Sequence, residues 1–111
     1  MGENMIPAQE VMEVLEKIGN CYIIPKLLGD PTTDGDVKFK CGKWVIVVFM
    51  DGGGFDYIEV AISPDKRKAE FDDWQVEGEI SAPECLLAAK DTQCYERMER
   101  IFEVVAGLRN D

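Results

Sequence analysis

Histidine is absent from this chain of 111 residues, and no two of its four cysteines are spaced as C-x-x-C. A zinc site needs ligands paired at short spacing, usually with histidine among them. The sequence therefore predicts no zinc site, and we expect no other cofactor.

The lack of histidine also removes the usual base for a serine or cysteine nucleophile, and no G-x-S-x-G motif is present. Cys41, between Lys40 and Lys43, is the only cysteine whose neighbours would lower the pKa of its thiol. We interpret Cys41 as a structural residue. The sequence therefore favours a protein that is not an enzyme.

Basic residues are scarce, since 12 Lys and Arg stand against 22 Asp and Glu and give a formal net charge of −10. Such a charge repels the phosphates of nucleic acids and of anionic lipids, and no run of basic residues along the chain reverses it. We expect neither a nucleic acid nor a membrane as partner. A protein or a small cationic ligand fits the charge better.

Long hydrophobic runs are missing as well. The longest, residues 44–50, has the sequence WVIVVFM and is far too short to span a bilayer. The first residues lack the basic stretch and apolar core of a secretory signal. We therefore expect a cytoplasmic protein whose cysteines are free thiols.

Helices are predicted near both ends of the chain. Residues 7–20 place Val11, Val14, Leu15 and Ile18 at helical spacing, and residues 92–108 repeat this pattern. On the second helix Glu103 is expected to face water. A shorter helix over 81–89 is predicted to begin with a capping box formed by Ser81 and Glu84.

Strand patterns occupy the middle of the chain, over residues 36–40, 44–50, 55–63 and, as a short last strand, 68–74. Residues 21–29 read as an edge strand or an extended bridge, because Pro25 cannot sit in a central strand. We predict one α+β domain over residues 1–111. Its architecture is an antiparallel meander of three to four strands with the N-terminal and C-terminal helices packed on one face.

Three consecutive glycines, residues 52–54, lie between two of the predicted strands. A phosphate-binding loop would require a lysine and a following helix, but a strand follows, and Asp51 and Asp56 flank the glycines. We interpret the glycines as a mobile hairpin tip.

The loop 30–36 places Asp30, Asp34 and Asp36 at positions that bind calcium in an EF-hand. Cys41 replaces the glutamate that completes such a site, and a strand follows where a helix is required. An acidic surface loop is the simpler interpretation. A divalent-ion site in this loop is the alternative, as is a small metal-dependent enzyme that uses these carboxylates or Glu70 and Asp72.

A cluster of acids and aromatic residues occupies the segment EFDDWQ, residues 70–75. If its aromatic residues were exposed, they would suit a cationic or peptide ligand; otherwise Phe71 and Trp74 belong to the core and the acids face solvent. The candidate surface for a ligand or partner comprises Trp44, Tyr57, Glu70, Asp72, Asp73 and Trp74.

Residues 42–74 contain a glycine and a Trp-led strand, an acidic turn, then FDYIEVAISPDKR and EFDDW. This order resembles a family of small uncharacterised bacterial domains. The resemblance implies a bacterial origin and an α+β fold, and it implies no catalytic residues. Lys66 stands where the turn of that family usually has glycine, which places a side chain where a positive φ is unfavourable. The sequence thus predicts a non-enzymatic, acidic, cytoplasmic binding or protein-interaction module.

Overall fold

The computed structural model describes residues 6–75, 78–79 and 81–109. Three α-helices, five strands and one 3₁₀-helix follow one another along these residues. They are α1 (Ala8–Gly19), β1 (Lys26–Leu28), β2 (Gly35–Cys41), β3 (Trp44–Asp51), β4 (Gly54–Ile62), β5 (Lys68–Glu70), η1 (Phe71–Trp74), α2 (Pro83–Lys90) and α3 (Thr92–Val105).

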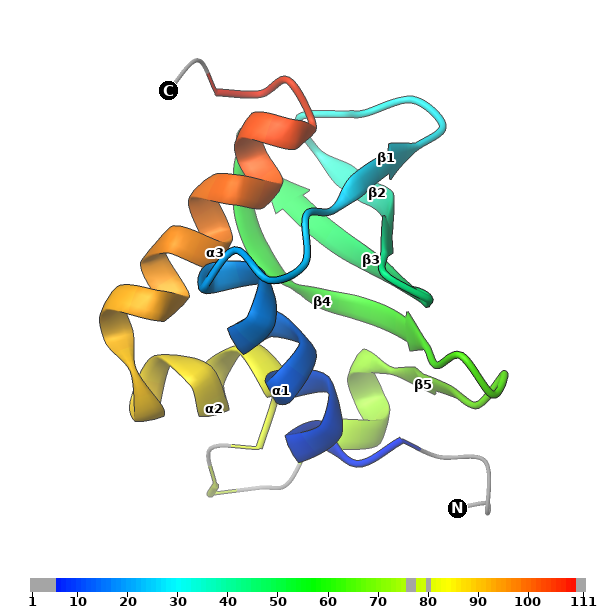
Figure 1. Cartoon of the computed structure of the whole chain (residues 1–111), viewed down its shortest axis with the longest axis vertical. Coiled ribbons are helices and arrows are strands. Elements are labelled where there is room, and N and C mark those ends of the chain that lie inside the picture. Colours follow the sequence, from blue (N-terminus) through cyan, green and yellow to red (C-terminus); the bar gives the residue numbers. More distant parts are fainter. Residues whose placement is uncertain (1–5, 76–77, 80, 110–111) are drawn as a thin grey trace.

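The strands form one antiparallel sheet in the order β1-β2-β3-β4-β5, and Figure 1 shows the helices gathered on one side of it. The α+β class is therefore confirmed. The prediction of three to four strands is too low, because β1 pairs with β2 from Lys26 to Leu28 and makes a fifth. Pro25 directly precedes β1, which fits the short edge position of this strand.

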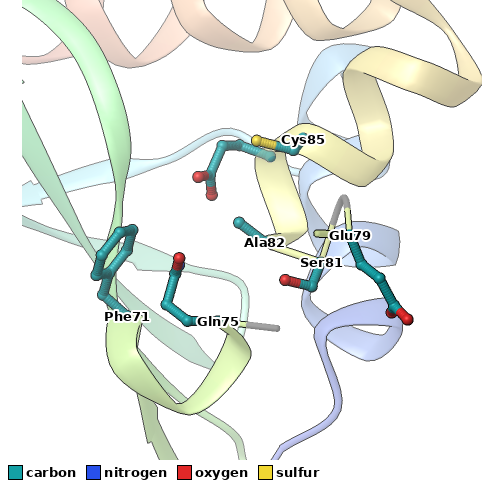
Figure 2. Close-up of a pocket in the computed structure, with 7 residues that line it drawn as sticks. Phe71, Gln75, Glu79, Ser81, Ala82 and Cys85 are labelled. Carbon is teal, nitrogen blue, oxygen red and sulfur yellow. The ribbon is translucent and has the colours of Figure 1, made fainter. Parts of the chain in front are cut away.

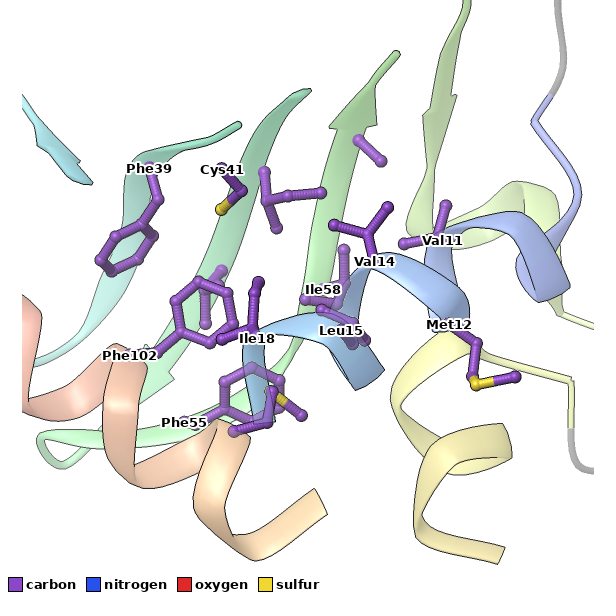
Figure 3. Packing of buried hydrophobic residues seen from close by; sticks show 14 of the residues in the cluster. Val11, Met12, Val14, Leu15, Ile18, Phe39, Cys41, Phe55, Ile58 and Phe102 are labelled. Atoms are coloured by element: carbon purple, nitrogen blue, oxygen red, sulfur yellow. The ribbon is translucent and has the colours of Figure 1, made fainter. Parts of the chain in front are cut away.

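The core lies between the helices and the inner face of the sheet. On β2, Val37 and Phe39 are fully buried while Lys38 and Lys40 are exposed, as the alternating pattern predicts. The ring of Phe39 meets that of Phe102 on α3 edge to face, with centroids 4.8 Å apart. Figure 3 shows the apolar side of α1 entering the same cluster.

The first and last helices meet closely at Gly19, the final residue of α1. A Cβ atom placed on Gly19 would lie 2.5 Å from both the carbonyl oxygen and the Sγ of Cys94 on α3. The Gly19 carbonyl also accepts a hydrogen bond from Nε of Arg97, at 3.0 Å. Glycine is thus required at this position because any larger residue would prevent the close contact between α1 and α3.

Strand β4 carries two irregularities, where its pairing with β3 shifts register. Near the second, the backbone N–H of Phe55 donates to Oε2 of Glu103 at 2.9 Å, and Oε1 of Glu103 accepts from Arg109 at 3.0 Å. Glu103 is buried, so the prediction that it faces water is wrong. At this irregularity the carboxylate of Glu103 serves as the acceptor for the backbone N–H of Phe55, in place of a carbonyl oxygen of a neighbouring strand.

The glycine run forms the predicted hairpin, with φ of +62° at Gly52 and +84° at Gly53. The backbone N–H of Gly52 donates to Oδ1 of Asp34 at 2.8 Å, and that of Gly53 donates to the carbonyl of Thr33 at 2.9 Å. These two bonds tie the hairpin tip to the acidic loop.

Lys66 has a φ of +73° in the turn between β4 and β5. Because glycine adopts this conformation without the clash of a Cβ atom, we expect Lys66→Gly to stabilise the fold by roughly 1 kcal/mol. Thermal unfolding of both proteins measures the difference. Lys43→Gly, in the neighbouring β2–β3 turn, serves as control, since Lys43 is not among the residues with positive φ. An unchanged or lower melting temperature for Lys66→Gly would contradict this account of the turn.

Candidate functional site

Neither tryptophan of the predicted ligand surface joins Tyr57 on an exposed surface. Trp74 is only 4% exposed, and its indole N–H donates to the carbonyl of Ile6 at 2.9 Å. Trp44 is half-buried against the core and pairs with Cys41, whereas Tyr57 pairs with Phe49 five residues further along β3. That distance along a strand is about 17 Å. Trp44 is therefore distant from Tyr57 along β3, and Trp74 is part of the core.

The predicted short strand 68–74 ends early, since β5 stops at Glu70 and η1 follows. The backbone N–H of Glu70 donates to Oδ2 of Asp73 at 2.8 Å, and the two residues cap η1 reciprocally. Glu70 also forms an ion pair with Lys68 at 3.5 Å, while Asp72 is exposed. Glu70 and Asp73 thus shape this turn.

Aromatic rings connect Tyr57 to η1. The ring of Tyr57 stacks on Phe49 with centroids 5.1 Å apart, and it meets Phe71 with centroids 4.4 Å apart. Phe71 is half-buried and borders a pocket on the side of η1 that faces α2. Tyr57 is therefore the member of the predicted surface whose ring packs against the wall of this pocket.

The pocket has a volume of about 280 Å³ and lies between η1 and the beginning of α2. Figure 2 shows the labelled side chains arranged around it. Among the residues that the structure describes, its lining includes Phe71, Gln75, Glu79, Ser81, Ala82, Glu84 and Cys85. Two of these residues are acids, and none is basic.

Glu84 is the buried acid of this lining, with an exposed fraction of 4%. Its Oε1 accepts from the backbone N–H of Ile58 at 3.3 Å, next to the first register shift of β4. Burial raises the pKa of Glu84, and the nearby charge of Asp56 raises it further, against the lowering effect of its backbone hydrogen bonds. Among the residues that the structure describes, no basic side chain forms an ion pair with Glu84.

The predicted capping box of Ser81 and Glu84 is not formed. Pro83 is the first residue of α2, so the N-cap is Ala82 and Glu84 stands one position too early to complete the box. Its side chain turns to β4 instead. No pattern in the sequence indicated Glu84, Glu79 or Gln75 as pocket residues. The proline would have signalled that Glu84 is free for a contact outside its own helix.

The thiols of Cys85 in the pocket and of Cys41 on β2 are poorly suited to attack a substrate. Burial raises the pKa of Cys85, and the charge of Glu84 raises it further, so the thiol stays protonated at neutral pH. Burial also raises the pKa of Cys41 to about 12. This supports the interpretation of Cys41 as a structural residue. The pocket offers the buried carboxylate of Glu84, the amide of Gln75 and the aromatic ring of Phe71, which is a set suited to holding a cation.

The acidic loop lies away from this pocket, at the glycine hairpin. Oδ1 of Asp34 accepts from Gly52, and Asp30 and Asp36 are exposed. Within residues 6–75, 78–79 and 81–109, no three His, Cys, Asp or Glu side chains are grouped closely enough to hold a metal ion. Over the same residues, no helix has the length and apolar character needed to cross a membrane.

The fold and the site define an α+β protein whose meander sheet is covered by helices on one face and carries an acidic pocket at one corner. A family model described as Domain of unknown function (DUF7693) matches residues 5–100, and the chain belongs to that family. This agrees with the resemblance to a small uncharacterised domain family. Searches of curated proteins and of solved structures found no match.

Proposed function

We propose that this protein is a non-enzymatic binding module of the bacterial cytoplasm, a single α+β domain that recognises a partner protein. In this proposal the pocket between η1 and α2 receives a lysine or arginine side chain of the partner. The observation that carries the proposal is the buried carboxylate of Glu84, which lines a pocket and has no cationic partner among the described residues.

A carboxylate that is removed from water gains more from a bound cation than an exposed one, because the surrounding dielectric constant is lower. The lining also includes the aromatic ring of Phe71 and the amide of Gln75. Glu79 belongs to the rim, where Figure 2 shows its carboxylate turned away from the other labelled side chains. Ligand pockets of proteins usually measure about 300–1,000 Å³. A pocket of about 280 Å³ is thus matched in size to one side chain or a similarly small cationic group.

The free cysteines support the cytoplasmic part of the proposal. All four cysteines are free thiols, and Cys21 and Cys85 are exposed. Exposed free thiols persist best in a reducing compartment. The bacterial part follows from the sequence pattern of residues 42–74 alone.

The direct test is a titration of the ¹⁵N-labelled protein with a short lysine-containing peptide, with amide shifts as the readout. We expect shifts at Gln75, Ala82 and Cys85, and a loss of binding of at least tenfold for Glu84→Gln, whose amide oxygen still accepts from Ile58. The same peptide with norleucine in place of lysine is the matched control. Equal shifts with both peptides, or shifts elsewhere only, would refute the proposal.

Binding of the lysine peptide should weaken as the pH falls through the raised pKa of Glu84. Protonation removes the charge that holds the cation, and it does so at a higher pH than for an ordinary glutamate. Because the pKa of Glu84 is higher in the folded than in the unfolded protein, ionising this residue destabilises the fold. That loss develops as the pH rises from the pKa of Glu84 in the unfolded protein to its pKa in the folded protein. Affinity measured from pH 4 to pH 8 tests the first effect. A Glu84→Gln protein with the same pH profile would contradict it.

A further inference from the structure

Lysines that are scattered along the sequence gather at one end of the sheet. Lys40 on β2 pairs with Val45 on β3, which in turn pairs with Ile62 on β4. Residues paired across antiparallel strands project to the same face. One row therefore crosses the whole sheet, and its members from β1 to β5 are Lys26, Lys40, Val45, Ile62 and Lys68.

This lysine row lies on the face that the helices leave uncovered. The neighbouring inner residues Phe39 and Ile46 are fully buried, so Lys40 and Val45 project in the opposite direction. All three lysines of the row are exposed, and Val45 and Ile62 are half-buried. The row thus presents positive charge around two aliphatic side chains.

Two turns at the same end of the sheet add further charge. Lys43 lies in the β2–β3 turn and Lys66 in the β4–β5 turn, and both are exposed. In the described part of the chain, no ion pair involves Lys26, Lys40, Lys43 or Lys66. The chain contains no basic run, and the pairing of strands assembles this cluster from lysines that are far apart in the sequence.

The register of β1 and β2 places Lys26 directly opposite Lys40. Like charges at directly opposed positions destabilise a pair of strands. In a protein with a net charge of −10, acidic side chains that could neutralise this pair are plentiful. Neither lysine forms an ion pair with the acids that the structure describes, which leaves both available to an anionic group from outside the chain.

We propose that this face binds an acidic, extended segment of a partner protein. Carboxylates of the segment contact Lys26 and Lys40, and at β5 they compete with Glu70 for Lys68. Apolar side chains of the segment cover Val45 and Ile62. The argument is charge complementarity, since the row is basic and apolar on an otherwise acidic molecule. The surface shares no residue with the pocket between η1 and α2, so it goes beyond the function proposed above.

A peptide segment fits this surface better than a nucleic acid does. The row offers aliphatic side chains and no aromatic ring on which a base would stack. A long polyanion would also extend beyond the lysines and meet the acidic remainder of the molecule. A short acidic segment matches the limited size of the lysine cluster.

The test uses a labelled peptide that alternates glutamate and leucine, followed by fluorescence anisotropy and by amide shifts of the ¹⁵N-labelled protein. We expect shifts at the residues of the row and an affinity that falls as salt rises. Lys40→Glu should weaken binding roughly fivefold or more, since it replaces an attractive contact with a repulsive one. Lys17→Glu makes the same charge change at an exposed position of α1 and should leave affinity within about twofold.

Equal losses from Lys40→Glu and Lys17→Glu would overturn the proposal, because only net charge would then matter. Shifts confined to other surfaces would overturn it as well. The same measurement is made with duplex DNA and with vesicles of anionic phospholipid. If either binds the row more tightly than the peptide does, the partner is a nucleic acid or a membrane, and the proposal of an acidic protein segment is wrong. Glu84→Gln should bind the acidic peptide normally, which separates this test from that of the pocket.

Discussion

Gly19→Ala is expected to destabilise the protein by about 3 kcal/mol, although the same change in an isolated helix would stabilise it by about 1 kcal/mol. The reason is the contact between α1 and α3, where the new Cβ atom would lie 2.5 Å from the carbonyl oxygen of Cys94. That oxygen belongs to the backbone of a helix and cannot rotate away. Chemical denaturation monitored by circular dichroism gives the free energy of unfolding.

Two further variants test the cause of this loss. Glu13→Ala changes an exposed residue of the same helix and should alter stability by less than about 0.5 kcal/mol. Gly19→Ala combined with Cys94→Ala removes the clash with Sγ but keeps that with the carbonyl oxygen, so the loss should largely persist. A Gly19→Ala protein as stable as the parent would show that the two helices do not meet as described.

Glu103→Leu should cost about 2–3 kcal/mol of folding stability. Leucine fills a similar volume but accepts no hydrogen bond, so the N–H of Phe55 would be left buried without a partner and Arg109 would lose its carboxylate. The free energy of unfolding is again the measurement.

Glu103→Gln is the matched variant, because its amide oxygen can still accept from Phe55. We expect it to lose no more than about 1 kcal/mol, mainly through the ion pair with Arg109. If Glu103→Leu and Glu103→Gln lowered the free energy of unfolding equally, the hydrogen bond from Phe55 to Glu103 would not stabilise the irregular part of β4.

Local patterns predict the elements of this fold well because each depends on neighbours in the chain. The spacing of Val11, Val14, Leu15 and Ile18 predicts α1, and alternation of Val37 and Phe39 with lysines predicts the inner face of β2. Strand β1 has only three residues after a proline, so its pattern is too short to separate a strand from an extended bridge.

The sites depend on contacts between distant residues, and there the sequence is a weaker guide. Glu84 and Glu103 look like exposed helix residues, but each accepts from a backbone N–H of β4 at a position where the register shifts. The positions of such bulges do not follow from the alternation of apolar residues. The lysine row likewise exists only once five strands are aligned, since its members are far apart along the chain.

The charge state of Glu84 offers the most direct test of the proposed pocket. NMR titration of its ¹³C-labelled side-chain carboxyl group yields the pKa of this residue with and without the lysine peptide. We expect a pKa above the ordinary value of glutamate in the free protein. Saturation with the lysine peptide should lower that pKa, because a bound cation favours the charged carboxylate, whereas the norleucine peptide should not change it. A pKa that is the same with and without the lysine peptide would contradict the proposal that this pocket receives a cationic side chain.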